Sequence, residues 1–266
     1  MFHPLKVTSI QSPNADAACR QITRYLGEQL GVAAEFVGDV TWQERERRLD
    51  AGEIHLGWIC GLPYVHKVDT ARLPLELAAA PVMRHPRYRQ QPVYFSDVIV
   101  HRDSRFRSFA DLRGATWAYN EPHSQSGYNL TRYHLATLAE YSGFFGRVIE
   151  AGAHLTALEM VLDRRIDATA IDSTVLELEL AARPQLGGQL RVIDTLGPSP
   201  IPPWVVSKNI APPFREAIRQ ALWQMHATPA GQAILSEGQI LKLVRVEDRD
   251  YDPIRKMAQL ASQVSW

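Results

Sequence analysis

Two serines and a glycine near the middle of the chain form the segment whose chemistry is easiest to interpret. The run Trp117–Tyr128 reads as a strand, a turn with Ser124, Gln125, Ser126 and Gly127, and then the start of a helix. The first N–H groups of a helix lack intrahelical partners, and the helix dipole favours negative charge there. Two hydroxyl donors and a glycine that permits close approach make this turn suitable for a small oxyanion. The alternative is that a serine only caps the helix and the glycine only shapes the turn.

Two further polar residues follow predicted strands or open predicted helices. His154 begins a helix pattern after Ala151–Ala153, and Asp172 ends the strand pattern 166–171. His154 could donate to an oxyanion oxygen or could pack beside the motif. Asp172 could face a ligand or cap the next helix.

Aromatic residues and one cysteine complete the candidates. Trp42, Tyr94 and Trp204 could line a pocket and hold an organic ligand or a cation against a ring face, although aromatic residues are usually core. Cys60 lies just beyond a strand end, where a pocket loop is expected. A Cys–His pair with His154 or His123 would suggest a nucleophile, but a cysteine in such a loop is more often a small buried apolar residue.

The charge balance excludes several classes of partner. The chain has 29 Lys and Arg against 29 Asp and Glu, a formal net charge of zero. Nucleic acids and anionic membranes favour basic surfaces, so neither is predicted. The histidines show no metal-site spacing, and two cysteines encode neither a cysteine-rich metal site nor a disulfide framework. We expect no metal and no cofactor, and no apolar run approaches the roughly 20 residues of a membrane helix.

Strand and helix patterns alternate along most of the chain, which is typical of an α/β fold. We expect strands at residues 6–10, 34–37, 54–58, 93–101, 116–119, 147–149 and 166–171. We expect helices to begin at the cap Asn14, at the capping box Thr41–Glu44, after Gly127, after His154, and near residues 213, 230 and 253.

Two interruptions of this alternation suggest a division into lobes. We interpret the long strand at 93–101 and a proline-rich stretch at 198–204 as crossings between lobes. One lobe would then comprise residues 1–95 and 203–266, with both chain ends, and the other residues 96–202. Ligands in such sheets bind at the carboxyl ends of strands, so we expect the ligand where loops of both lobes face each other.

Several motifs carry a resemblance to a known family. Phe109–Gly114, a strand and then Ser-x-Ser-Gly-Tyr resembles the phosphonate-binding receptors of ABC transporters. Tyr94 is similar to that family's ligand-facing tyrosine, His154 matches its histidine position, and Glu53–Trp58 matches its strand ending in Trp. The similarity spans about Thr41 to Ser207.

This resemblance implies a two-lobed α/β clamshell of the periplasmic-binding-protein type 2, each lobe a mixed sheet flanked by helices. It implies a solute-binding protein without catalysis, which captures a small phosphonate- or phosphate-like oxyanion, as a monomer, for an ABC permease. The ligand-binding residues implied by motif and resemblance together are Ser124, Gln125, Ser126, Gly127, Tyr94, His154, Asp172, Trp42, Cys60 and Trp204.

The chain departs from the family in the half of the site that holds an amine. Aminoalkyl-phosphonate receptors have a carboxylate where this chain has Thr174, and a second where it has Pro202 and Pro203. Trp42 stands in place of a family tyrosine. Asp172 is the carboxylate that could replace the missing ones, so the oxyanion half looks retained and the amine half does not.

Two other functions and the location stay open at this stage. A soluble sensor that signals to a partner protein is one alternative, and an enzyme on the same clamshell, using Cys60 and a histidine, is a less favoured one. The resemblance implies the periplasm, but the chain as given opens without a basic and then apolar leader. A native start at Met1 would instead predict the cytoplasm.

Overall fold

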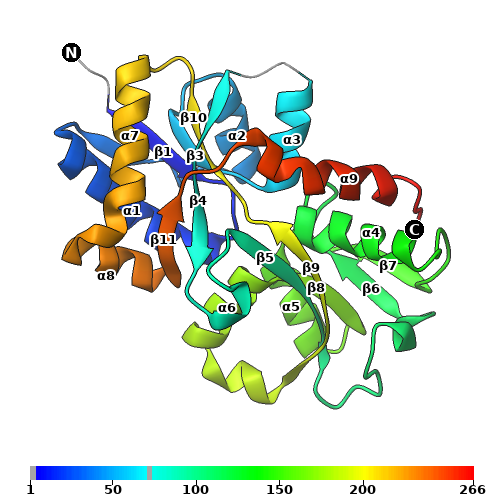
Figure 1. Ribbon diagram of the computed structural model, residues 1–266. Helices are drawn as coiled ribbons and strands as arrows, with labels where there is room; N and C mark the ends of the chain where they lie inside the picture. Colours follow the sequence, from blue (N-terminus) through cyan, green and yellow to red (C-terminus); the bar gives the residue numbers. More distant parts are fainter. Residues whose placement is uncertain (1–3, 71–73) are drawn as a thin grey trace. The chain divides into compact units, whose positions relative to one another are not determined.

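The computed structural model describes residues 4–70 and 74–266, which form two compact α/β units (Figure 1). The first unit comprises Met1–Val93 and Pro200–Tyr251, and the second comprises Tyr94–Ser199 and Asp252–Trp266. Within the described residues, no helix combines the length and apolar character needed to cross a membrane.

The first unit is built on a six-stranded mixed sheet in the order β11-β4-β10-β3-β1-β2. β1 pairs in parallel with β2 and β3, whereas β10 runs antiparallel to β3 and β4. The carboxyl ends of β1, β2 and β3 therefore share one edge with the start of β10, where ligand-binding loops are expected in α/β sheets. The strands are β1 Leu5–Ser9, β2 Ala34–Phe36, β3 Leu56–Trp58, β4 Leu75–Met83, β10 Trp204–Ser207 and β11 Ile240–Val244.

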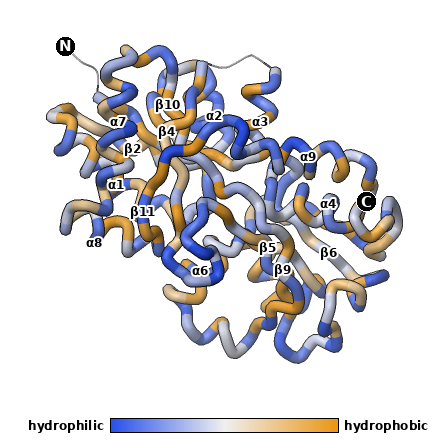
Figure 2. Tube along the Cα trace, in the orientation of Figure 1, coloured by the Kyte–Doolittle hydropathy of each residue, from blue (hydrophilic) through white to orange (hydrophobic). Residues whose placement is uncertain are grey.

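Helices cover this sheet, with apolar residues concentrated along strands such as β11 (Figure 2). α1 packs against α7 and α8, and α7 also contacts β4 and β11 (Figure 1). Thr41 caps α2 as predicted, with its hydroxyl oxygen accepting from the Glu44 N–H. The helices are α1 Asp16–Leu30, α2 Trp42–Asp50, α3 Gly61–Asp69, α7 Pro212–Gln224 and α8 Pro229–Glu237.

The start of the first helix differs from the prediction. Asn14 was expected as its cap, but Pro13–Ala15 form a short 3-10 turn and α1 begins at Asp16. Pro13 has the φ that such a turn needs, so the chain coils before the α-helix begins. The other end is as expected, because Gly31 adopts a left-handed φ of 64°.

The second unit has a five-stranded mixed sheet in the order β7-β6-β8-β5-β9. β6 pairs in parallel with β7 and β8, and β5 runs antiparallel to β8. The carboxyl ends of β6, β7 and β8 therefore lie at one edge, together with the start of β5. The strands are β5 Val93–His101, β6 Thr116–Tyr119, β7 Arg147–Glu150, β8 Ala168–Asp172 and β9 Leu190–Pro200.

Successive residues of these strands face two separate apolar cores, one on each side of the sheet. Trp117 belongs to a cluster with Phe109 and Phe145, whereas its neighbour Ala118 belongs to a cluster with Leu158. Strand side chains alternate between faces, so a sheet with a core on both sides gives continuous apolar strands. The elements that cover it are η3 Ala110–Leu112, η4 Gln125–Asn129, α4 Leu130–Thr137, α5 His154–Leu162, α6 Ser173–Ala182 and α9 Asp252–Ala261.

The C-terminal helix corrects the predicted domain boundaries. Residues 203–266 were expected to belong entirely to the first unit, but α9 and the tail after it belong to the second. α9 packs beside α4 (Figure 1), and Val264 enters the core that contains Trp117. The chain passes between units after Val93, after Ser199 and again after Tyr251.

Four strands, β4, β9, β10 and β11, were missing from the sequence prediction. β4 contains three consecutive alanines and Pro81, residue types that are depleted in strands, and it pairs with β11 at one end of the first sheet. β9 includes Pro198 and Pro200, which we had interpreted as a connection between lobes. It lies at the edge of its sheet, where proline is tolerated because one side of the strand needs no hydrogen bonds.

The packing of α9 gives a direct test of this boundary. Ile254 is fully buried, whereas Leu260 on the same helix is exposed. We expect Ile254→Ala to lower the free energy of unfolding by about 2–4 kcal/mol, because it leaves a cavity. The control Leu260→Ala should change it by less than about 0.5 kcal/mol. Urea denaturation measures both, and equal effects would contradict the placement of α9.

Candidate functional site

The candidate site lies at the carboxyl edge of the second sheet, where three parallel strands end together. β6 ends at Tyr119 and leads to the serine motif, β7 leads to His154, and β8 ends at Asp172. The parallel register, with Tyr119 opposite Glu150, keeps these ends level. The residues Ser124–Gly127, His154 and Asp172 are therefore gathered by strand pairing although they are far apart in sequence.

Ser124 opens the helix of the motif. Its hydroxyl oxygen accepts from the Gly127 N–H at 3.1 Å and lies 3.4 Å from the Ser126 hydroxyl oxygen. The sequence alternative of a capping serine is therefore correct for Ser124. Capping uses one lone pair and leaves the O–H free to donate elsewhere, so it does not exclude ligand binding.

The helix that follows is of the π type over Gln125–Asn129, with the Asn129 N–H donating to the Ser124 carbonyl at 3.0 Å. Because this is its first backbone bond, the N–H groups of Ser126 and Tyr128 have no backbone partner within the helix, whereas the Gly127 N–H donates to the Ser124 Oγ. Single π-turns are rare and occur often at functional sites. The wider turn thus presents backbone donors beside two hydroxyls.

His154 joins the motif through Ser126. Its Nε2 lies 2.9 Å from the Ser126 Oγ, and its Nδ1 is buried with no hydrogen-bond partner in the described part of the chain. Burial lowers the pKa of His154 to about 4. The imidazole is therefore neutral at physiological pH, and it can act as a hydrogen-bonding group without adding a charge.

A second contact fixes the motif to the sheet. The Ser96 hydroxyl donates to the Ser126 carbonyl at 2.9 Å, and Ser96 lies opposite Asp172 in the β5–β8 pair. Tyr94, two residues before Ser96, is fully buried at the start of β5. The predicted residues Tyr94, Ser126 and Asp172 thus come from neighbouring elements of one edge.

Gln125 has a different position from the one expected of a ligand contact. Its side chain is fully buried, its Nε2 lies 3.2 Å from the Ser199 Oγ and 3.3 Å from the Met257 Sδ, and its Oε1 accepts from Asn129 at 2.7 Å. The amide is used within the second unit. Gln125 therefore anchors the motif to β9 and α9, and its side chain acts by positioning.

Asp172 caps α6, as one of the two sequence interpretations had it. Its Oδ1 accepts from the Thr174 N–H at 2.8 Å and from the Thr174 hydroxyl at 2.7 Å. Burial raises the pKa of Asp172 to about 6 in spite of these bonds, and the charge of nearby Asp97 adds to the effect. The carboxylate lies at the edge with the serines and is already engaged by Thr174.

The other three candidates belong to the first unit, at the carboxyl edge of its own parallel strands. Trp42 is the first residue of α2, and half-buried Cys60 is the residue before α3. Trp204 starts β10 and stacks on Trp58 at 5.7 Å, with its Nε1 buried and without a hydrogen-bond partner among the described residues. Sheet topology thus places these three at the edge where a binding loop is expected.

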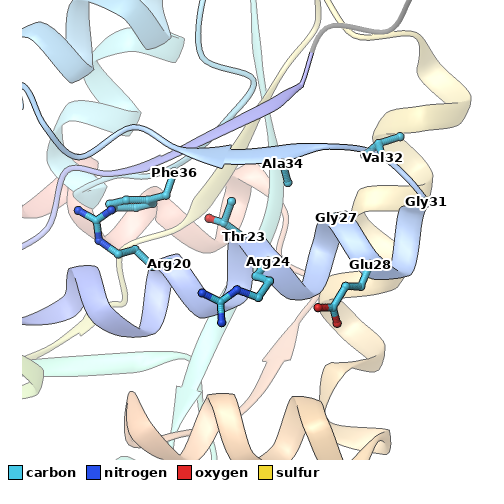
Figure 3. Close-up of a pocket in the computed structure, with 9 residues that line it drawn as sticks. All are labelled: Arg20, Thr23, Arg24, Gly27, Glu28, Gly31, Val32, Ala34 and Phe36. Atoms are coloured by element: carbon cyan, nitrogen blue, oxygen red, sulfur yellow. The ribbon is translucent and has the colours of Figure 1, made fainter.

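A groove of about 550 Å³ lies elsewhere in the first unit, between α1 and the edge strand β2 (Figure 3). The Arg20 guanidinium lies 4.5 Å from the centre of the Phe36 ring, and Arg24 and Glu28 project from the same helix. The Arg20 guanidinium, stacked on the Phe36 ring, places a charged group at the unpaired side of the edge strand β2, which disfavours pairing with another chain. None of the ten predicted site residues lines this groove.

Neither a metal site nor a disulfide is formed by the described residues. Over 4–70 and 74–266, no group of three His, Cys, Asp or Glu side chains is placed to hold a metal ion. Cys19 is buried and burial raises the pKa of its thiol to about 12, whereas Cys60 is separate and half-buried. The two cysteines are not bonded to each other.

Sequence reasoning missed one residue of this edge. Asn120 directly follows β6, lies between the strand and the serine motif, and is 9% exposed. Its position after a strand end was the available signal. Its neighbours Glu121 and Pro122 suggest an ordinary turn, so the sequence alone does not distinguish Asn120 from a turn former.

Comparison with known proteins shows the family of the chain. The family model for the periplasmic substrate-binding protein of phosphonate ABC transporters matches residues 6–251. The phosphonates-binding periplasmic protein of Escherichia coli (strain K12) is 26% identical over 172 residues, which are 63% of this chain. The aligned segment spans only 51%, about half, of that relative.

Solved structures show the fold. A binding protein component of an ABC phosphonate transporter from Pseudomonas aeruginosa has a TM-score of 0.84 at 19% identity, over 98% of this chain and 87% of its own. PhnD1 from Prochlorococcus marinus (MIT 9301), in complex with methylphosphonate, has a TM-score of 0.81 at 16% identity, over 98% of both chains. The fold is thus the two-lobed type 2 periplasmic-binding-protein fold.

The neutral state of His154 predicts a pH dependence of stability. An unfolded histidine has a pKa near 6.5 and folded His154 one of about 4, so between these values the unfolded chain binds a proton that the folded protein does not. Folded stability therefore falls as pH falls through this window. When the pH is lowered from 7 to 5, the free energy of unfolding should therefore fall by about 1–2 kcal/mol less in His154→Gln than in the wild type.

Urea denaturation at both pH values measures this difference. His226→Gln is the matched control, because His226 is exposed. An identical pH response in His154→Gln and the wild type would show that burial does not lower the pKa of His154 in the folded protein.

Proposed function

Because the chain belongs to the family of periplasmic substrate-binding proteins of phosphonate ABC transporters, we propose that it captures a phosphonate- or phosphate-like oxyanion at the carboxyl edge of its second sheet. The observation that carries the proposal is the pair Ser126 and His154, 2.9 Å apart beside the capping Ser124. Hydroxyl, imidazole and backbone N–H groups converge there at the start of a helix.

The chemistry of this edge suits reversible capture. The serine hydroxyls and N–H groups are uncharged, and His154 is neutral because its pKa is about 4. Neutral donors at a helix start stabilise an anion, yet need no compensating charge when the site is empty. The site can therefore release its ligand without leaving a buried cation unpaired.

We propose that the protein does not transform its ligand. The family is one of substrate-binding transport proteins. The segment Ile59–Pro63 around Cys60, the candidate nucleophile, contains no charged residue. A thiol needs a neighbouring cation, a helix start or a paired histidine to become reactive, and the start of α3 is the feature that this segment itself supplies.

The proposed partners are a small oxyanion and the permease of an ABC transporter. We propose that the protein acts as a monomer in the periplasm. A related protein was solved with methylphosphonate, which makes that compound a suitable first ligand. Sensing would use the same site with a signalling protein as partner. Reconstituted uptake with the cognate permease distinguishes transport from sensing, since a sensor would not stimulate uptake.

The serines give the most direct test of the site. We expect the double variant Ser124→Ala, Ser126→Ala to bind methylphosphonate and phosphate at least about 100-fold more weakly, because each hydrogen bond to a charged ligand contributes about 1.5–3 kcal/mol. Titration calorimetry measures the affinity, and ³¹P NMR of the recovered ligand shows whether it is unchanged.

Ser207→Ala is the matched control, because Ser207 is also fully buried but lies at the far end of β10 in the first unit. Equal affinity in the double variant and the wild type would contradict the site. A chemically altered ligand would instead favour an enzyme.

Ligands with an ammonium group should bind poorly. Thr174 stands where aminoalkyl-phosphonate receptors have a carboxylate, and its hydroxyl already donates to Asp172. An unpaired buried ammonium costs several kcal/mol, so we expect 2-aminoethylphosphonate to bind at least about tenfold more weakly than methylphosphonate. Competition calorimetry compares the two, and tighter binding of the amine would mean that Asp172 or the aromatic residues supply the missing partner.

A further inference from the structure

Asn120 is a buried polar residue that the fold does not use. It follows the last residue of β6, and the residue is only 9% exposed. Its Oδ1 is fully buried and has no hydrogen-bond partner within the described part of the chain. Buried amides are normally paired, so an unpaired one in a native protein needs an explanation.

The amide lies directly against the serine motif. A Cβ atom on Gly127 would be 2.1 Å from the Asn120 Oδ1 and 3.1 Å from the His154 Cε1. Gly127 thus has no side chain because the Asn120 carbonyl and the His154 ring occupy that space. Asn120, Gly127 and His154 meet at one point of the carboxyl edge.

The orientation of the amide follows from this contact. Its carbonyl oxygen is held over Gly127, where the Cα–H group is a weak donor at best. In a planar amide the NH₂ branch then points away from Gly127. This branch is an uncharged donor, of the same kind as the serine hydroxyls and the backbone N–H groups of the helix start.

We propose that Asn120 is a further oxyanion-binding residue, whose side-chain NH₂ donates to an oxygen of the bound ligand. This inference rests on the proposed function of the Ser124–Gly127 motif. It assigns the ligand a fourth hydrogen-bonding element besides the serines, His154 and the helix start. It also explains why residue 127 is glycine: a methyl group there would displace the amide from its position.

The effect of replacing Asn120 on the stability of the fold depends on whether the residue serves binding or folding. Replacement of a residue that serves folding lowers the free energy of unfolding, whereas replacement of one that serves binding does not. Replacing an unpaired buried polar group by an apolar group of similar shape is neutral or stabilising. We therefore expect Asn120→Leu to unfold at the same or a higher urea concentration than the wild type. We also expect it to bind methylphosphonate and inorganic phosphate about 10- to 100-fold more weakly.

Two further variants sharpen the test. Asn120→Asp keeps the shape but replaces the donor by a carboxylate, so we expect it to lose more than about 100-fold in affinity, since an anion then faces an anion. Thr131→Val is the matched control, because Thr131 is fully buried and its Oγ1 also lacks a partner in the described chain. It should match Asn120→Leu in stability but retain wild-type affinity.

The measurements are titration calorimetry with the two anions, urea denaturation without ligand, and the ¹H–¹⁵N signals of the Asn120 side chain. The NH₂ signals should shift on binding. Unchanged affinity of Asn120→Leu, or NH₂ signals that stay fixed while the backbone signals of residues 124–127 shift, would overturn the inference alone. Failure of the wild-type protein to bind either anion would overturn the proposed function, and this inference with it.

Discussion

The parallel pairing of β6 with β7 and β8 is the constraint on which the candidate site depends. It ends three strands at one edge, so that His154 reaches Ser126 at 2.9 Å although 28 positions separate them. The apolar clusters on the two faces of this sheet hold the strands in that register. A slip by one residue would turn Trp117 out of its core and take the motif away from the histidine.

Around this edge, the polar groups fall into two kinds. Gln125 and Ser96 bind other parts of the second unit and hold the motif in place. Ser124, Ser126 and His154 retain hydrogen-bonding capacity beyond the bonds they make with each other. A rigid support with unused neutral donors is preorganised for an anion, so less ordering is needed when the ligand binds.

The sequence predicted the parts of this architecture that local patterns determine. The strands at 93–101 and 116–119, the Thr41 cap and the start of α5 at His154 lie where the patterns indicated. The placement of α9 could not be predicted, because an amphipathic helix shows that it packs but not against which core. The roles of Gln125 and Asn120 were equally inaccessible, since they depend on contacts with Met257, Gly127 and His154 that only the folded chain creates.

The most direct measurement of the central claim is a ¹H–¹⁵N titration of the intact protein with methylphosphonate, with the backbone signals assigned. The account predicts that the N–H signals of Ser126 and Tyr128 show the largest saturating shifts in the second unit, because a bound oxyanion supplies the backbone partners that these groups in the first turn of η4 lack. Saturable binding that leaves these two signals unmoved would contradict it.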